Sequence, residues 1–573
     1  MSLNDLPIFD VSTIPFSRRG AWINLSPVTA LHTTSDLIHL VSHQNGMHAV
    51  LSLAPESSAG SVAASIQSTP ASLVWNCEGG GRIEAVFESA DALRIRGTGV
   101  AMRISDAAGM LTPFTGCYLF VDARDGSAVF TSYETGHRYR ITMIEGGREV
   151  LGSESLGSGA REVLLGDDQA WEAVVEELDA ARAPCAPVRT FDEAAENSRN
   201  DYLAFLADIA PWRTTQTPAV ELAVYVLWSA AVNPKGYLRR ESILMSKHWM
   251  DKVWSWDQCF NALATAGIPE LALAQFMTPF DHQDESGALP DSVAHSEVLY
   301  NYVKPPIHGW ALERLRADGV EIDEPTLRQI LENLSAWTQF WLDARRKPGS
   351  NLPYYQHGND SGWDNSTVFD VDRTVESPDL AAFLLVQLDV LARLSEELGE
   401  DRSRWDEESV RLREALLSEL WRGDGFVARG VTSGVDSKRT SLLTMLPLLA
   451  SPLLPPEYVA PMVAGVSRFL TEFGPATQRV DSPEYEPDGY WRGPIWAPST
   501  MLIEDGLRRA GADDLADEVS IRFRRLCERS GFAENFDALT GVGLRDRAYT
   551  WTASVYLVLC REAMRRSGHG KFA

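Results

Sequence analysis

The chain has 573 residues, of which 45% are hydrophobic, and it carries a formal net charge of −27. This apolar content supports a large core and excludes global disorder, and the length allows two or three ordinary domains or one small and one large domain. The acidic balance repels phosphate backbones and anionic lipid, so we expect neither a nucleic-acid nor a membrane partner, whereas a neutral substrate such as a sugar is compatible with it.

Residues 1–7 contain neither the basic stretch nor the apolar stretch that a secretory signal needs. No run in the sequence approaches 18 apolar residues, so no membrane-spanning helix is expected. The six cysteines show no paired spacing of the zinc type, which favours reduced, buried thiols. These features predict a cytoplasmic protein without a metal and without a cofactor; its oligomeric state is not readable from the sequence.

Residues 1–185 are predicted to form an N-terminal β-rich domain of the sandwich type. Short runs of β-branched and aromatic residues alternate with turn formers such as Asp125-Gly126, which is typical of antiparallel sheets. The predicted strands cover residues 83–87, 93–96, 118–121, 129–131 and 139–143.

From about residue 190 the hydrophobic period changes to that of helices. About a dozen helical stretches without alternating strands favour an (α/α)6 barrel over residues 186–573, since we find no fixed repeat of a solenoid. The predicted fold class is therefore mainly α: an (α/α)6 toroid barrel with an N-terminal β-sandwich-like domain. The predicted helices cover residues 192–210, 217–232, 256–266, 269–279, 307–317, 324–345, 378–398, 403–420, 438–450, 456–472, 494–510, 513–529 and 548–566.

Aromatic residues next to carboxylates gather in the long segments between these helices. Aromatic rings stack on the apolar faces of sugars, and carboxylates bind hydroxyls and move protons, so the pattern indicates a carbohydrate-cleaving enzyme. Long ordered loops of this kind are often functional. The clusters are Trp254-Ser-Trp256-Asp257, Ser361-Gly-Trp363-Asp364-Asn365-Ser366, Tyr490-Trp491-Arg492-Gly-Pro-Ile-Trp496 and Glu534-Asn-Phe-Asp537.

Hydrolysis of a glycoside takes two carboxyl groups, one that protonates the leaving oxygen and one that activates water or attacks directly. Asp364 and Glu534 are the candidates, because each lies beside aromatic residues whose burial would keep an acid protonated near neutral pH. They are 170 residues apart, so only the fold can bring them together. Taken alone, Asp364 is equally well explained as a turn or helix-cap residue.

The four clusters, in this order, resemble glycoside hydrolase family 63, which includes processing α-glucosidase I and bacterial enzymes acting on glucosyl- or mannosylglycerate. The resemblance covers about residues 200–573 and implies an (α/α)6 barrel and inversion at the anomeric carbon. By the same match, Asp364 is the general acid and Glu534 the general base. Ala538 stands where relatives often have proline, which affects loop stiffness more than chemistry.

The remaining site residues are expected to bind the substrate. Trp254, Trp256 and Asp257 resemble the wall and the hydroxyl anchor of the subsite that holds the non-reducing sugar. Arg492 is expected to bind sugar hydroxyls or to hold Glu534. His308 is either a substrate-binding residue or a purely structural residue of the core. The substrate-binding set is Trp254, Trp256, Asp257, Trp363, Tyr490, Trp491, Arg492 and His308.

The first interpretation is an inverting α-glucosidase that acts on short α-glucosides or oligosaccharides. The alternatives are a glucosylglycerate or mannosylglycerate hydrolase, for which Arg429, Arg479 or Arg492 is available to the glycerate carboxylate, and a trehalase-like enzyme. Outside the hydrolases, a polysaccharide lyase or a sugar-binding protein remains open. The acidic charge argues weakly against a lyase of uronates, which usually has a basic groove.

Overall fold

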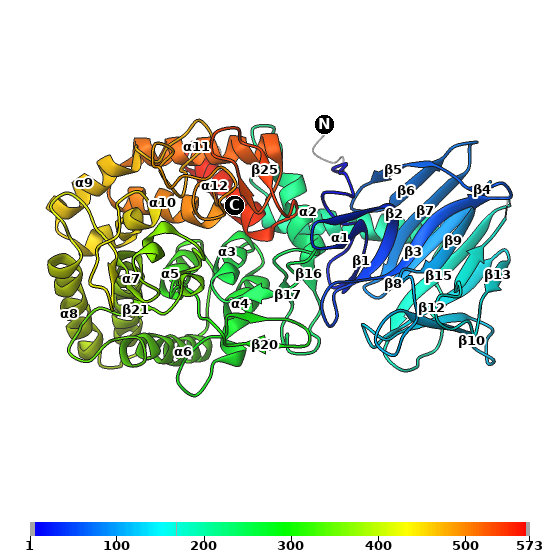
Figure 1. The fold of residues 1–573 in the computed structure, drawn as a ribbon, viewed down its shortest axis with the longest axis horizontal. Helices are drawn as coiled ribbons and strands as arrows, with labels where there is room; N and C mark the ends of the chain where they lie inside the picture. The colour runs from blue at the N-terminus through cyan, green and yellow to red at the C-terminus, as the bar shows by residue number, and fades with distance from the viewer. Residues whose placement is uncertain (1–5, 168, 569–573) are drawn as a thin grey trace. The chain divides into compact units, whose positions relative to one another are not determined.

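The computed structural model describes residues 6–167 and 169–568. It divides into two compact units (Figure 1). The N-terminal unit holds the residues up to Thr214 together with Val224–Lys252 and Ala294–Ser296, and the C-terminal unit holds Thr215–Ala223, Val253–Val293 and the residues from Glu297 onward. The chain thus passes between the units more often than a single boundary at residues 185–186 implies.

The N-terminal unit contains two large antiparallel sheets, whose strands run side by side in Figure 1. The first has the order β1-β2-β3-β9-β14-β13, with β4 paired to β3, and the second has the order β10-β11-β12-β15-β8-β7-β6-β5. The strands of the first are β1 (Ile23–Ala30), β2 (Thr33–Ser42), β3 (His48–Ser57), β4 (Gly60–Ser61), β9 (Ala101–Asp106), β13 (Arg148–Leu151) and β14 (Glu162–Leu165). Those of the second are β5 (Ala64–Ser68), β6 (Leu73–Cys77), β7 (Arg82–Ser89), β8 (Ala92–Thr98), β10 (Cys117–Val121), β11 (Ala128–Ser132), β12 (Arg138–Glu145) and β15 (Trp171–Leu178).

All five strands predicted from the sequence are confirmed, as parts of β7, β8, β10, β11 and β12. Many of their apolar side chains are buried, for example Ile83, Phe87 and Ile95, whereas Val121 at the end of β10 is exposed. The predicted fold class is nevertheless wrong, because the chain has 35% helix and 24% strand and is not mainly α. Strand β2 was not predicted, because serine, threonine and histidine interrupt the apolar pattern of its sequence.

Helix α1 (Phe191–Ile209) begins where the sequence stops favouring strands. Thr190 accepts a hydrogen bond from the Glu193 backbone N–H, and the Glu193 side chain accepts one from the Thr190 backbone N–H. This reciprocal capping satisfies two backbone donors that the first turn would otherwise leave free. Helix α1 is followed by helix α2 (Val220–Ala230) and by the paired strands β16 (Ala231–Val232) and β17 (Ser242–Ile243).

The inner helical elements of the C-terminal unit contact one another in a closed series, α3–α5–α7–η4–α10–α12, with α12 returning to α3. These elements are largely buried. For example, every residue of α3 is buried, as expected of a helix that is surrounded by other elements on nearly all sides. Their bounds are α3 (Asp257–Ala264), α5 (His308–Ala317), α7 (Pro378–Glu397), the 3-10 helix η4 (Leu442–Leu453), α10 (Ala497–Arg509) and α12 (Thr550–Arg566).

A second set of helices covers this ring from outside, each packed on one of its elements. These helices bury one face only, and their starts carry the expected signals: Asp323 caps α6 by accepting from the Thr326 backbone N–H at 3.0 Å. The set comprises α4 (Pro269–Met277), α6 (Glu324–Asp343), α8 (Ser403–Glu419), α9 (Pro456–Val466) and α11 (Asp513–Ser530).

Short antiparallel strand pairs fix the loops between these helices. They are β18 (Val253–Trp254) with β19 (Ser292–Val293) and β20 (Val298–Leu299); β21 (Tyr354–Tyr355) with β22 (Val375–Glu376) and β23 (Arg429–Gly430); and β24 (Asn535–Phe536) with β25 (Gly543–Leu544). Three single 3-10 turns complete the loops: η1 (Pro279–His282), η2 (Gly358–Ser361) and η3 (Thr367–Asp370). Within residues 6–167 and 169–568, no helix combines the length and the apolarity needed to cross a bilayer.

Candidate active site

The first aromatic cluster lies where β18 leads into α3. Trp254 pairs with Ser292 across the short sheet, and the Ser255 N–H donates to the Asp291 carbonyl at 3.3 Å. Asp257 is the first residue of α3 and is buried. The sheet therefore sets Asp257 beside the 287–291 loop.

The second cluster follows η2 and is held against the first by a glycine. Gly362 has φ +70°, and a Cβ at this position would lie 2.5 Å from the Trp256 ring. The Ser361 hydroxyl donates to the Gly358 carbonyl at 2.6 Å and accepts from the Trp363 N–H at 3.1 Å. Only glycine meets both the left-handed backbone and the close ring contact, so the Ser-Gly-Trp-Asp sequence has a structural reason.

Asn365 joins the second cluster to the third. Its Nδ2 donates to the Gly489 carbonyl at 3.0 Å, and its Oδ1 accepts from the Trp491 N–H at 3.0 Å. Between these two anchors Tyr490 adopts φ +62°, an uncommon conformation for a residue other than glycine. The residue next to the candidate acid thus fixes the backbone that presents the Tyr490 side chain.

Backbone pairing joins the third cluster to the fourth. The N–H groups of Ile495 and Phe536 each donate to the other residue's carbonyl, at 2.8 and 3.0 Å. The Glu534 N–H donates to the Asp546 carbonyl at 2.7 Å, and the indole N–H of Trp551 reaches the Glu534 carbonyl at 3.4 Å. Loops far apart in the sequence are thereby fastened to one another.

Several of the aromatic residues pack together. Trp491 stacks on Trp496 with ring centroids 4.0 Å apart and lies 4.8 Å from Trp363. Trp256, Trp363 and Trp491 are each at most 2% exposed, which leaves little ring surface for a sugar. Trp254 and Tyr490 keep partly exposed surface. The sequence treated these rings as one substrate-binding set, and the structure divides them into a buried framework and two accessible rings.

Burial dominates the electrostatics of Glu534. It raises the pKa of this carboxyl to about 8, and the charge of the neighbouring Asp546 adds to the rise. The positive charge of Arg545 and a hydrogen bond from the Tyr490 hydroxyl act in the opposite direction. Glu534 therefore holds its proton far more firmly than an exposed glutamate.

Asp364 lies near a buried group of charges. Burial raises its pKa, the charge of Asp291 adds to this, and the charge of Lys304 opposes it. Lys304 forms an ion pair with Asp291 at 2.9 Å. Burial also raises the pKa of Asp257, on which the charges of Lys304, Asp291 and Asp364 act as well.

Tyr490 connects the two candidate catalytic carboxyls. Burial raises the pKa of its phenol, and the negative charges of Glu534 and Asp364 both add to that rise. Burial and the charges of Glu534 and Asp257 do the same for Tyr549. Groups separated by 170 residues in the chain therefore act on one hydroxyl. Two carboxyls with raised pKa values, gathered among aromatic rings, suit acid–base chemistry on an uncharged bond.

His308 and Arg492 occupy more structural settings. The His308 ring is fully buried, its Nε2 lies 3.1 Å from the Ser255 carbonyl, and burial lowers its pKa to about 4. The Arg492 Nε donates to the Asn365 carbonyl at 2.9 Å, and its Nη1 donates to Asp370 at 3.1 Å. The cation whose charge acts on Glu534 is Arg545.

Arg545, Asp546 and Tyr549 were missed by sequence reasoning. Arg545 has φ +60° and lies 5.0 Å from the Tyr490 ring centroid, and Asp546 is fully buried. The available signal was a run of charged residues, Arg545-Asp546-Arg547, directly before the apolar helix α12. A charged residue that is fully buried is usually paired with another polar or charged group.

Comparisons with known proteins match the part of the chain that carries these residues. The family model "Mannosylglycerate hydrolase MGH1-like glycoside hydrolase domain" matches residues 250–552. The mannosylglycerate hydrolase of Rubrobacter radiotolerans is 25% identical over 409 residues, covering 53% of this chain and 89% of that protein. The glucosylglycerate hydrolase of Mycolicibacterium hassiacum is 23% identical over 456 residues, covering 60% of this chain and 98% of that protein.

A solved structure shares the fold of the matched region. The GH63 mannosylglycerate hydrolase from Thermus thermophilus in complex with Tris superposes with a TM-score of 0.54 at 22% identity, covering 60% of this chain and 100% of that chain. The expected resemblance to family 63 is confirmed. Because the family model spans more than half of its length, this chain belongs to the mannosylglycerate hydrolase MGH1-like glycoside hydrolases of family 63.

Proposed function

We propose that the enzyme hydrolyses an α-linked hexosylglycerate, that is, glucosylglycerate or mannosylglycerate, to the free sugar and glycerate. The observation that carries the catalytic part is the action of both Asp364 and Glu534 on the Tyr490 hydroxyl. The names of the relatives support the glycerate part. They favour this alternative over the first interpretation, an α-glucosidase for short saccharides.

In the proposed mechanism, Asp364 holds the proton that is transferred to the glycosidic oxygen as the bond to C1 breaks. Its burial suits this role, because burial favours the protonated form. Glu534, once ionised, takes a proton from the water that attacks C1 from the opposite face. The products are then the inverted, β-configured sugar and glycerate, with the proton of the water on Glu534.

Arg545 is our candidate for the glycerate carboxylate. Its guanidinium donates to Asn535 Oδ1 at 3.0 Å and pairs with Asp488 at 2.7 Å, and the Asp488 side chain is 68% exposed. A substrate carboxylate can replace such an exposed partner at small cost, since surface ion pairs contribute little. The cations proposed from the sequence are paired as well: Arg429 with Glu376 and Glu419, and Arg479 with Asp481.

Proton NMR of the released anomer tests the reaction. The panel contains glucosylglycerate, mannosylglycerate, kojibiose, nigerose, maltose and trehalose. We expect fresh β-sugar from a hexosylglycerate, and nearly complete loss of turnover in Asp364→Asn and in Glu534→Gln, each with unchanged circular dichroism. Fresh α-sugar would contradict the assigned roles, and faster turnover of the disaccharides would restore the α-glucosidase interpretation.

An uncharged analogue tests the role of Arg545. In Arg545→Gln we expect KM for glucosylglycerate to rise by at least about tenfold, the effect of losing one charge-assisted hydrogen bond. The same variant should change KM for glucosylglycerol, which lacks the carboxylate, much less. Arg439→Gln, which removes an arginine paired to the exposed Asp424, is the matched control. Equal effects on both substrates would assign the glycerate to another cation.

A further inference from the structure

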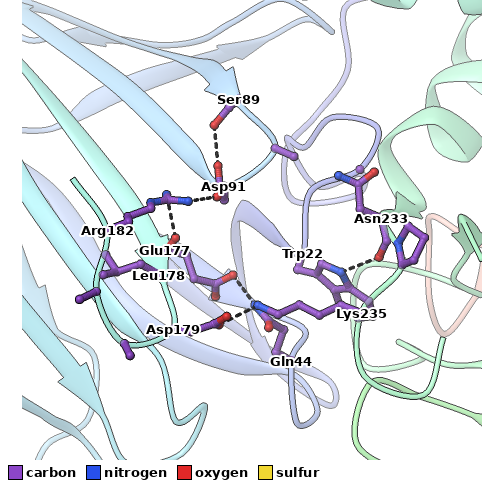
Figure 2. A pocket seen from close by; sticks show the side chains of 15 residues that line it. Trp22, Gln44, Ser89, Asp91, Glu177, Leu178, Asp179, Arg182, Asn233 and Lys235 are labelled. Carbon is purple, nitrogen blue, oxygen red and sulfur yellow. Dashed lines mark hydrogen bonds and ion pairs between the residues drawn. The ribbon is translucent and has the colours of Figure 1, made fainter. Parts of the chain in front are cut away.

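The N-terminal unit encloses a cavity of about 440 Å³ that the hydrolytic mechanism does not use (Figure 2). One wall is formed by the β7–β8 turn, with Ser89 and Asp91, and by the end of β15, with Glu177. Trp22 and Lys235 lie on the opposite side of the view in Figure 2. Its size lies in the range of pockets that hold small molecules.

The charges around this cavity are already paired. Lys235 Nζ lies 2.9 Å from the Asp179 carboxylate. Arg182 pairs with Asp91, and its Nε donates to Glu176 at 2.9 Å. Neither cation is left over to attract an anion, and carboxylates lie beside both. The lining therefore favours an uncharged ligand over a phosphate or a carboxylate.

The cavity lining includes a residue with an unused hydrogen-bond acceptor. Gln44 is fully buried, and its Nε2 donates to the Glu177 carboxylate, which also accepts from Ser42 at 2.9 Å and from Tyr139 at 3.0 Å. The Gln44 Oε1 has no partner within the described part of the chain. Buried polar atoms are nearly always hydrogen-bonded, so this oxygen indicates a missing donor such as a hydroxyl.

Trp22 supplies the apolar component of the lining. Its indole N–H donates to the Asn233 carbonyl at 3.0 Å, and its ring meets the edge of His295 at 5.4 Å, which fixes its orientation. Trp22 is 5% exposed, so it offers the cavity the rim of a fixed apolar ring. An apolar rim beside hydrogen-bond acceptors matches the two surfaces of a sugar, C–H groups and hydroxyls. We propose that this cavity binds a neutral polyhydroxylated ligand of monosaccharide size, as a carbohydrate-binding site of the N-terminal unit.

Hydrogen exchange measured by mass spectrometry on the full-length enzyme tests the proposal, because it reports binding peptide by peptide. The probes are D-glucose, D-mannose and glycerol, with inorganic phosphate as the anion probe. We expect at least one neutral probe to slow exchange in peptides covering residues 171–183 and 230–236, and phosphate to leave them unchanged. The signal is separate from any binding at the catalytic residues, which lie in other peptides.

A matched pair of variants locates the ligand. Ala181 lines the cavity and is exposed, so Ala181→Trp should fill its mouth and weaken binding by at least about tenfold, whereas Ala183→Trp, exposed on the same loop but outside the lining, should not. Ala180→Trp replaces Ala181→Trp if the latter does not fold. No protection by any neutral probe, equal protection in both variants, or stronger protection by phosphate would each overturn the proposal.

Discussion

The hydrogen bond from Tyr490 to Glu534 predicts a specific pH effect. To act as the base, Glu534 must be ionised, and its pKa of about 8 makes kcat/KM rise with pH up to that region. The Tyr490 hydroxyl lowers this pKa by donating to the carboxylate. In Tyr490→Phe the ionised form loses that donor, so the pKa must rise further and the acid limb must move to higher pH.

The size of the effect follows from the burial of the pair. Glu534 is 4% exposed, so water cannot replace the lost donor, and a hydrogen bond to a charged group contributes about 1.5–3 kcal/mol. At about 1.4 kcal/mol for each tenfold change, the acid limb moves up by about one to two pH units. At pH values well below the acid limb, kcat/KM of Tyr490→Phe is then about 10- to 100-fold lower than that of the wild type.

The assay is the pH profile of kcat/KM, which reports the ionisations of the free enzyme. Tyr485→Phe is the matched control: the residue lies on the same loop, and its hydroxyl has no partner among the residues that the structure describes. We expect the control to keep the wild-type limb. An unchanged limb in Tyr490→Phe, or one that moves to lower pH, would refute the role assigned to this hydroxyl.

Three further predictions concern stability and loop positioning. The pKa of Glu534 in the folded protein is raised from the ordinary 4.5 to about 8, so the folded state binds the proton of this carboxyl more tightly than the unfolded state does. The resulting contribution to the free energy of unfolding is complete below pH 4.5 and is lost as the pH rises to about 8. The thermal midpoint of Glu534→Gln should therefore fall less over this range than that of the wild type. Gly362→Ala should lower the thermal midpoint, because alanine in the left-handed backbone conformation costs about 1–3 kcal/mol of the free energy of unfolding and its Cβ also clashes with Trp256. An unchanged midpoint would contradict this contact. Asn365→Ala should reduce kcat by about tenfold or more and lower the free energy of unfolding by about 1–3 kcal/mol, because it frees the Trp491 backbone beside Asp364, the proposed general acid. Full kcat with a lowered midpoint would mean that Asn365 serves stability alone.

The sequence allowed the aromatic–acid clusters to be recognised, because each is short and chemically distinctive. It did not reveal how they are fastened, since Asn365 reaches Gly489 across 124 residues and Ile495 pairs with Phe536 through backbone atoms that any residue would supply. Arg545 was missed for the same reason, because its importance depends on its closeness to Glu534 and Tyr490. Local patterns predict which groups are present, and only long-range contacts determine which of them meet.

The extent of the N-terminal unit was unpredictable on similar grounds. The sequence analysis ended the β-rich domain at residue 185, but the compact unit extends to Thr214 and also takes in Val224–Lys252. Long-range hydrogen bonds explain this: the Tyr225 hydroxyl contacts the carbonyls of Pro15 and Ser17 at 3.1 and 3.3 Å, across about 210 residues of chain. No periodicity in the sequence reports such a contact.

The extended N-terminal unit also holds the segment around Lys247 in place. Lys247 is buried there, with its Nζ donating to the Ser17 hydroxyl at 3.0 Å and to the Ala21 carbonyl, and its own carbonyl accepts from Asn24 at 2.8 Å. Burial lowers the pKa of the Lys247 amine, and removal of these N-terminal partners would leave that buried polar group without hydrogen bonds, which is unfavourable. Seven residues later the same segment becomes the Trp254 cluster. The N-terminal unit therefore holds the segment that precedes this cluster in the chain, a structural role that is independent of any ligand that the unit binds.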